Sequence, residues 1–282
     1  MTNFANCAEY TDGLLDGKTI GIAGFGHLGS SIAAALAANG FPKERLLISC
    51  GGSAATLARA ERMGLASCMT DTRTLVSRAD FILLAARPQD LGSFAGLRLK
   101  EGAFVMSFMA GISLATLHKV FDAELCRVMC SGPETITDGM GVSATFPSEA
   151  RPHAVLRAAG LEVFDLSCES ELDAFTVAIC LPPILLNVEL SEAETDATLA
   201  AMAKRYPVCR GLAPWIGRVV EAHRAEKSES SLENVSTKGG VTEAMTTALR
   251  GGSTLAGSIA AGLARCAEIS AELAKRFAAH AA

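Results

Sequence analysis

The sequence predicts an α/β protein in which an N-terminal Rossmann-type, doubly wound sheet is followed by an all-α C-terminal domain. From Lys18 to about Val142, short apolar runs alternate with amphipathic stretches, the pattern of strand-helix-strand units around a parallel sheet. A glycine-rich turn follows the first apolar run, and strand-like runs disappear beyond Ser167. We therefore expect a sheet domain at residues 1–167, with an N-terminal extension at 1–17, and a helical domain at 168–282.

The individual elements can be placed by their patterns. Continuous apolar runs, typical of strands buried on both faces, lie at Thr19–Ala23, Arg45–Ser49, Phe81–Ala85, Phe104–Phe108 and Leu125–Met129. A last strand is expected at Glu162–Leu166, where it would close the sheet. Helical spacing predicts helices at Glu171–Arg205, interrupted by Pro182 and Pro183, at Trp215–Arg224 and at Leu255–Ala279. The polar stretch Ala225–Ser236 reads as a loop.

Composition excludes several classes of function. The chain has 282 residues, and 25 Lys and Arg against 30 Asp and Glu give a net charge of -5 with no block of like charge. This excludes the basic face that nucleic-acid binding needs. No apolar run reaches the ~20 residues of a membrane span, and the N-terminal segment lacks the regions of a signal peptide. We expect a soluble, cytoplasmic protein that binds neither nucleic acid nor membrane.

The cysteines and histidines predict no metal site. Nine cysteines are scattered along the chain without a CxxC motif, as expected for reduced thiols that pack as small apolar residues. Cys126 and Cys130 are the closest pair, but no second pair or nearby His completes a tetrahedral site. The five histidines are equally dispersed, which argues against a Cys and His catalytic pair.

The turn after the first strand has the spacing of a dinucleotide-binding loop. The first glycine of such a loop permits a tight turn, the second lets a pyrophosphate approach the backbone, and the third allows the helix to pack on the strand. The alternative is a structural glycine turn, but the preceding buried strand and the following helix favour dinucleotide binding. The residues expected to hold the cofactor are Gly24, Phe25, Gly26, His27, Leu28 and Gly29.

The end of the second strand favours NADP over NAD. An NAD-binding protein usually carries an Asp or Glu there for the adenosine ribose, whereas this chain has small, uncharged residues from Ser49 to Ser53. Ser49 and Gly51 could receive a 2'-phosphate through hydroxyl and backbone donors, and Arg59 is the nearest cation downstream. NAD remains the alternative, because no Arg lies in the loop itself.

Two further loops should face the nicotinamide half of the cofactor, because ligands of open α/β sheets bind at the carboxyl ends of the strands. The strand ending at Ala85 leads into Arg87, Pro88 and Gln89, and the strand ending at Phe108 leads into Ala110. An ordinary strand-ending turn, with Pro88 fixing the backbone, explains the first of these loops equally well.

A second pair of glycines opens a helix in the C-terminal part. Gly239 and Gly240 precede the segment that starts at Val241, and their N–H groups at a positive helix end suit a substrate carboxylate. Thr242 would project a hydroxyl there, and Glu243 is placed to cap the first turn. A glycine turn before a capped helix is the structural alternative.

The order of these motifs resembles the pyrroline-5-carboxylate reductase family from about Lys18 to Leu273. The segments that carry the resemblance are IAGFGHLGSSIAAAL, LLAARPQDL, SFMAGIS, RVMCSGP and VSTKGGVTEAM. The last three match the family's strand-end Ala-Gly, its Arg-Val-Met-Pro-Asn-Thr-Pro and its Ser-Pro-Gly-Gly-x-Thr signature.

The resemblance implies an NAD(P)H-dependent reductase that transfers hydride to the C=N carbon of a cyclic imino acid and makes proline. It implies that the C-terminal domain is a dimerisation domain, and the Ala-rich stretch Leu255–Leu273 fits close helix packing across a homodimer. Carried over by position, Thr237 and Thr242 match the family's substrate-contacting Ser and Thr, with Thr242 as the catalytic residue. Gly239 and Gly240 would bind the substrate carboxylate.

The sequence departs from the family in three places. Lys238 replaces the signature proline, Cys130-Ser131-Gly132 replaces Pro-Asn-Thr, and AICLPPILL replaces a Ser-Gly-Ser-Gly-Pro segment near the nicotinamide. We expect a reshaped pocket. The alternatives are a related reductase of another imine or of a β-hydroxy or keto acid, which would need an acid such as Lys near Asn187, and a non-catalytic NADP-binding protein.

Overall fold

The computed structural model describes residues 13–188, 190–224 and 238–280. Most of the predicted extension, the loop predicted at Ala225–Ser236 and the predicted substrate residue Thr237 lie outside these ranges. Among the described residues, no helix is both long and apolar enough to cross a membrane. The eight cysteines in this part are free, and no group of three or more His, Cys, Asp or Glu there could hold a metal ion.

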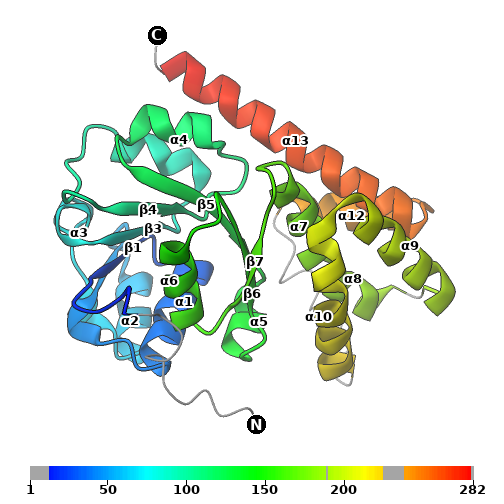
Figure 1. Ribbon diagram of the computed structural model, residues 1–282, viewed down its shortest axis with the longest axis horizontal. Coiled ribbons are helices and arrows are strands. Elements are labelled where there is room, and N and C mark those ends of the chain that lie inside the picture. The colour runs from blue at the N-terminus through cyan, green and yellow to red at the C-terminus, as the bar shows by residue number, and fades with distance from the viewer. Residues whose placement is uncertain (1–12, 189, 225–237, 281–282) are drawn as a thin grey trace.

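The centre of the N-terminal half is a seven-stranded sheet in the order β2-β1-β3-β4-β5-β6-β7 (Figure 1). All neighbouring strands are parallel except β5 and β6, which are antiparallel. The chain order reverses between β1 and β3, which is the switch point of a doubly wound sheet. The predicted fold class is therefore confirmed. The strands are β1 Ile20–Ala23, β2 Leu46–Ser49, β3 Phe81–Leu84, β4 Phe104–Ser107, β5 Glu124–Cys130, β6 Val142–Phe146 and β7 Glu162–Asp165.

The central strands are buried on both faces, as their continuous apolar runs predict. Every residue of β1, β3 and β4 is buried. Alternate side chains enter two different cores: Phe81 and Leu83 join one cluster, and Ile82 and Leu84 join the other. The helices of this half are α1 His27–Ala38, α2 Ala54–Arg62, α3 Thr72–Arg78, α4 Leu114–Val120, α5 Pro133–Thr137 and α6 Ala150–Ala158, with 3-10 turns η2 Lys43–Arg45, η3 Ala66–Cys68 and η4 Pro88–Phe94.

Strand β6 was not predicted from the sequence. Its run Val-Ser-Ala-Thr-Phe is polar at alternate positions, yet Ser143 and Thr145 are fully buried. The Thr145 hydroxyl lies 3.0 Å from Nε2 of His153 on α6, and this contact satisfies a buried polar group that an apolar run would not contain. The predicted start of the second strand also needs a small correction, because Arg45 lies in the turn η2 and not in the strand.

Helices make up the described chain beyond β7, as predicted. Pro182 and Pro183 lie in the first turn of a new helix, α8, where proline is tolerated, and so mark a helix start. The helix predicted at Trp215–Arg224 begins earlier, at Pro207. The domain boundary at 167/168 stays a prediction. The helices are α7 Glu171–Ile179, α8 Leu181–Asn187, α9 Glu192–Arg205, α10 Pro207–His223, α12 Val241–Arg250 and α13 Leu255–His280.

The long helix α13 runs from the helical part back to the sheet (Figure 1). Leu273 of α13 is buried in the same core cluster as Met109 and Ile112, which belong to the loop after β4. Between these two lies Gly111, with φ +76°, where an added Cβ would lie 2.7 Å from Cγ2 of Ile269. The loop after β4 is therefore held against α13 by a close backbone approach that only glycine allows.

We expect Gly111→Ala to loosen this contact. A side chain at positive φ costs about 1 kcal/mol, and the overlap with α13 should add about 1 to 2 kcal/mol. Gly102→Ala is the matched control, because Gly102 has φ +71° but nothing within 4 Å of its added Cβ. Urea unfolding of both variants measures the difference. Equal destabilisation would contradict the close packing of α13 on this loop.

Candidate active site

The glycine loop after β1 is fixed by two of its glycines and left open at the third. Gly24 has φ +111°, and an added Cβ would lie 2.5 Å from the backbone N of Ala86. A Cβ at Gly29 would lie 2.0 Å from Gly24 O. A Cβ at Gly26 would have nothing within 4 Å. The loop is therefore tightly packed at Gly24 and Gly29, whereas the space beside Gly26 is open and a ligand could approach the backbone there.

The N-terminus of α1 is suited to an anion. Gly26 is its N-cap, no side chain caps it, and its first turn contains no acidic residue. The free N–H groups and the helix dipole therefore remain available for a phosphate. Phe25 is buried in the core, so only its backbone can face a ligand, whereas His27 is exposed and Leu28 is half-buried. This chain's residues fit the pyrophosphate of a dinucleotide.

The end of β2 carries no acidic residue beside this loop. Ser49 is 2% exposed and its hydroxyl accepts a hydrogen bond of 3.2 Å from the Thr72 hydroxyl, so its side chain is part of the fold. Gly51 is exposed, and Ser53 caps α2 by accepting the Thr56 N–H. The exposed backbone of this loop is the part that can face an adenosine ribose.

The loops after β3 and β4 lie at the same edge of the sheet, because both follow the carboxyl ends of neighbouring parallel strands. Arg87 is 79% exposed and forms a bidentate ion pair with Asp90, at 3.1 Å from Nε and 3.2 Å from Nη2. Pro88 begins η4, and Gln89 is exposed. Ala110 is exposed on the loop after β4. Because Gly24 approaches Ala86, the loop after β3 also contacts the glycine loop.

A buried charge cluster at this edge was missed from the sequence. Arg127 on β5 is in register with Ser107, the last residue of β4, and its Nη1 lies 2.8 Å from Oε1 of Glu169. The same oxygen accepts the Leu114 N–H at 2.9 Å. Burial raises the pKa of the nearby Asp173 carboxyl, and the Arg127 charge opposes this shift. A lone Arg in an apolar strand is the signal that could have revealed the ion pair.

We expect Arg127→Leu to destabilise the protein by about 2 kcal/mol, less than the loss of a fully buried pair, because the Glu169 side chain is 31% exposed. Denaturant unfolding measures the change. Glu169→Gln in the same chain removes the uncompensated carboxylate, so the double variant should be more stable than the sum of the single losses predicts. Additive losses would show that the pair contributes nothing by itself.

One N–H group of the second glycine pair is occupied from within the chain. The Gly239 N–H donates to Oε2 of Glu243 at 2.6 Å, and Gly240 is the N-cap of α12. The Thr242 hydroxyl donates to Sγ of Cys180 at 3.3 Å. The role predicted for Gly239 and Gly240 toward a substrate carboxylate stays a prediction, and a carboxylate bound at Gly239 would have to displace Glu243. Glu243 takes that position, as the capping alternative predicts.

Cys180 is half-buried, and the burial of its sulfur raises the pKa of its thiol to about 11. It is therefore a neutral thiol at physiological pH, and its sulfur holds the Thr242 hydroxyl in place. Thr242 is only 8% exposed. The sequence does not predict this contact, because the two residues are far apart in the chain and on different helices.

Helix α13 contacts both the glycine turn before α12 and the loop after β4. Nε of Arg265 donates to Gly239 O at 2.8 Å, and about one turn later Ile269 lies against Gly111. Among the described residues, no hydrogen bond or ion pair joins the loop after β1 directly to the start of α12. The structure thus relates the predicted cofactor and substrate residues through α13 and the loop after β4.

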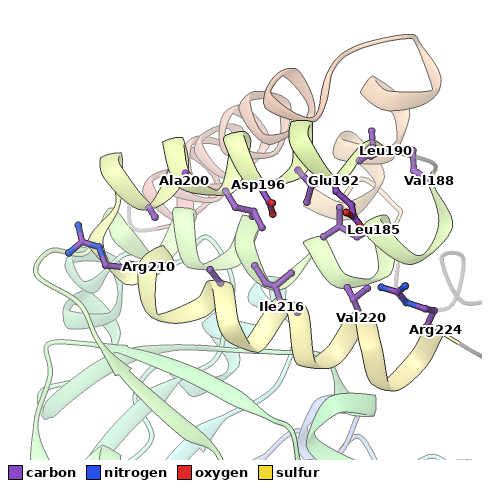
Figure 2. A pocket seen from close by; sticks show the side chains of 15 residues that line it. Leu185, Val188, Leu190, Glu192, Asp196, Ala200, Arg210, Ile216, Val220 and Arg224 are labelled. Atoms are coloured by element: carbon purple, nitrogen blue, oxygen red, sulfur yellow. The ribbon is translucent and has the colours of Figure 1, made fainter.

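A separate cavity of about 680 Å³ lies between α8, α9 and α10 and contains none of the predicted site residues (Figure 2). Its wall is mainly apolar, with Glu192 and Asp196 on α9, Arg210 on α10 and Arg224 directly after α10. The apolar residues are Leu185, Val188, Leu190, Leu199, Ala200, Ala203, Ala213, Ile216 and Val220.

Comparisons with known proteins agree with this geometry. Residues 19–111 match the family model described as NADP oxidoreductase coenzyme F420-dependent. No curated protein sequence matches the chain significantly.

The whole fold is similar to solved pyrroline-5-carboxylate reductases. The Plasmodium falciparum enzyme, solved with NADP bound, is 16% identical with a TM-score of 0.55, covering 90% of this chain and 97% of that one. The Coxiella burnetii protein is 20% identical with a TM-score of 0.54, and the Streptococcus pyogenes enzyme is 21% identical with a TM-score of 0.54. Both comparisons cover 90% of this chain and 98% of the other. The chain therefore has the fold of the pyrroline-5-carboxylate reductases, and its first third matches an NADP oxidoreductase family.

Proposed function

We propose that the protein is an NADPH-dependent reductase that transfers hydride to the carbon of a C=N bond in a small cyclic imine. The observation that carries this proposal is the loop after β1, where Gly24 and Gly29 are tightly packed and Gly26 faces open space at an uncapped helix end. The similarity in fold to pyrroline-5-carboxylate reductases supports the reaction class. With pyrroline-5-carboxylate as the substrate, the product would be proline.

In this proposal one set of residues binds the cofactor, and Thr242 positions the substrate. Residues 24–29 and the N-terminus of α1 hold the pyrophosphate, and the exposed backbone near Gly51 faces the adenosine ribose. The absence of an acid at the end of β2 favours NADP, because a carboxylate there would repel a 2'-phosphate. Arg87, Pro88, Gln89 and Ala110 line the nicotinamide side. The bound cofactor supplies the hydride.

Thr242 orients the substrate against the nicotinamide side. Its hydroxyl proton points to Cys180, so the oxygen lone pairs remain for an N–H group of the substrate. A protonated imine is already electrophilic, and the protein does not have to donate a proton during hydride transfer. Holding the two reacting carbons together would supply most of the rate.

The proposal is tested by NADPH oxidation with purified protein and a panel of cyclic imines, with and without carboxylates, and with hydroxy acids in the oxidative direction. Turnover of an imine together with inactivity toward hydroxy acids is the expected result. Helix α8 contains no Lys that could serve a hydroxy-acid reaction. Binding of NADPH with no turnover of the whole panel would instead indicate a non-catalytic nucleotide-binding protein.

We further propose that the helical part forms a homodimer through the cavity between α8, α9 and α10 (Figure 2). An apolar wall of this size favours burial against another helix, and the wall also carries acidic and basic residues that a second copy can complement. Light scattering should show a dimer for the natural sequence and a monomer for Leu199→Glu. A monomer in both cases would contradict the proposal.

The proposed setting is the cytoplasm, where free thiols persist and reduced nicotinamide is present. The eight described cysteines are all free, which agrees with this setting.

A further inference from the structure

A row of paired residues crosses the sheet near the carboxyl ends of its first strands and finishes at Arg127. In spatial order the row contains Ser49, Ala23, Leu84, Ser107 and Arg127. In the proposed binding mode the pyrophosphate lies at the glycine loop, directly after Ala23. The adenosine half then lies toward β2, and the nicotinamide half extends past β3 and β4 toward Arg127.

Arg127 is buried, yet it uses only one of its donor atoms within the described part of the chain. The residue is 7% exposed, and its hydrogen bond there runs from Nη1 to Oε1 of Glu169 at 2.8 Å. No fully enclosed side-chain nitrogen or oxygen of the described residues lacks a hydrogen-bond partner. Nε and Nη2 of Arg127 therefore border accessible space, where their N–H groups remain for a ligand.

Asp173 brings a carboxyl group close to this guanidinium. It is half-buried on α7, between the buried residues Leu172 and Ala174. Burial raises the pKa of the Asp173 carboxyl and the Arg127 charge opposes this shift, so the two groups lie near each other. Among the described residues, however, the Asp173 carboxyl has no hydrogen bond or ion pair. Arg127 and Asp173 are thus a donor and an acceptor that do not satisfy each other, and we call them the donor–acceptor pair.

The donor–acceptor pair lies beside the loop after β4. Glu169, which holds Arg127, also accepts the Leu114 N–H at 2.9 Å, shortly after that loop. Asp173 lies near Cys266 of α13, because burial and then the Asp173 charge raise the pKa of this thiol to about 12. About one turn further along, α13 contacts the glycine of the same loop. The pair is therefore placed where the loop after β4 meets α13, on the proposed nicotinamide side.

We infer that Arg127 and Asp173 bind the carboxamide group of the nicotinamide ring. This inference rests on the proposed function, because it concerns the cofactor of the same site. A primary amide has a carbonyl oxygen that accepts from the Arg127 N–H groups and an NH2 group that donates to the Asp173 carboxyl. A carboxylate would use the Arg127 donors but leave Asp173 beside a like charge. The donor–acceptor pair therefore matches an amide better than an anion.

Binding at both ends of the amide restrains the ring as well as holding it. A carboxamide fixed at its oxygen and at its nitrogen cannot turn over, so the ring presents one face to the substrate in every turnover. Arg127 and Asp173 are positioning residues for hydride transfer in this account, because they touch the cofactor and not the reacting carbons.

The experiment measures the binding of three compounds by calorimetric titration: NADPH, its reduced 3-acetylpyridine analogue and 2'-phospho-ADP-ribose. The analogue has a methyl ketone in place of the amide, so it keeps the carbonyl and lacks the NH2 group. The third compound lacks the nicotinamide ring. We expect the natural sequence to bind NADPH at least about tenfold more tightly than the analogue, because the ketone leaves the Asp173 carboxyl without a partner.

Two variants should give different results in this experiment. In Asp173→Leu the preference for NADPH over the analogue should disappear. In Arg127→Leu both compounds should bind about tenfold more weakly, because both carry the carbonyl, and the preference should remain. Neither variant should change the affinity for 2'-phospho-ADP-ribose. Asp122→Leu is the control, because Asp122 is exposed just before β5, at the opposite end of the strand.

Thermal unfolding verifies that the variants are folded at the temperature of the titrations, and Asp173→Ala replaces Asp173→Leu if the latter is not. Equal affinity of the natural sequence for NADPH and the analogue would overturn the inference without any variant. A preference that persists in the Asp173 variant would overturn it too, as would a loss of 2'-phospho-ADP-ribose binding there, which indicates a purely structural role.

The imine assay separates this inference from the proposed function. The expected binding pattern without turnover of any imine would support the inference and overturn the proposed reaction. Turnover of an imine by a protein that does not distinguish NADPH from the analogue would overturn the inference alone. A change in Asp173→Leu that is confined to the KM of a carboxylate-bearing imine would mean that the donor–acceptor pair binds the substrate, which also overturns it.

Discussion

Replacing Gly26 with valine is expected to abolish cofactor binding while the protein still folds. A Cβ at this position meets nothing within 4 Å, so the free protein has room for the side chain. The same space is where a pyrophosphate approaches the start of α1. We expect NADPH affinity to fall by at least about a hundredfold, or about 3 kcal/mol, measured by calorimetric titration.

Two other glycines provide controls for this result. Gly217→Val adds a side chain at another open position, on α10 and away from the predicted cofactor residues, and should leave NADPH affinity unchanged. Gly29→Ala should destabilise the fold itself, because its Cβ would lie 2.0 Å from Gly24 O. Unchanged NADPH binding in Gly26→Val would show that this loop does not hold the cofactor.

Replacing Thr242 with valine is expected to lower kcat about a hundredfold, or about 3 kcal/mol in transition-state stabilisation, without changing NADPH affinity. Valine keeps the shape of the side chain but removes the oxygen that would hold the substrate nitrogen. Steady-state kinetics on the preferred imine measures kcat, and titration measures the cofactor.

Thr246→Val is the matched control for that substitution. Thr246 is equally buried, at 8% exposure, and lies one turn further along α12, but its hydroxyl donates to the Thr242 and Glu243 carbonyls of its own helix. Its loss should alter stability and leave kcat nearly unchanged. Equal kcat losses in both variants would mean that Thr242 acts only through the fold.

Most strands of the sheet could be predicted because the residue pattern that marks each strand lies within the strand itself. Continuous apolar runs marked β1, β3 and β4, and the glycine directly after Ala23 adopts a φ of +111° that favours glycine. Strand β6 escaped prediction because its burial depends on partners outside the strand, such as His153, which contacts Thr145. A pattern within five residues does not contain that information.

The candidate site was predictable to a similar degree. The capping of α12 by Glu243 was foreseen as an alternative, because the acid and the glycines lie within a few residues. The contacts of Thr242 with Cys180 and of Arg265 with Gly239 join different helices, and no local spacing encodes them. These long-range contacts decide which donors and acceptors of the site remain free, so they bear on the substrate more than the motifs do.

Isotope transfer measures the proposed reaction most directly. The protein is supplied with NADPH carrying two deuterium atoms at C4 of the nicotinamide and with 1-pyrroline, and the product is analysed by mass spectrometry and NMR. We predict that pyrrolidine gains one deuterium, on the carbon of the former C=N bond, and that Gly26→Val abolishes the transfer. Cofactor binding without any deuterium in the product would contradict the proposed hydride transfer.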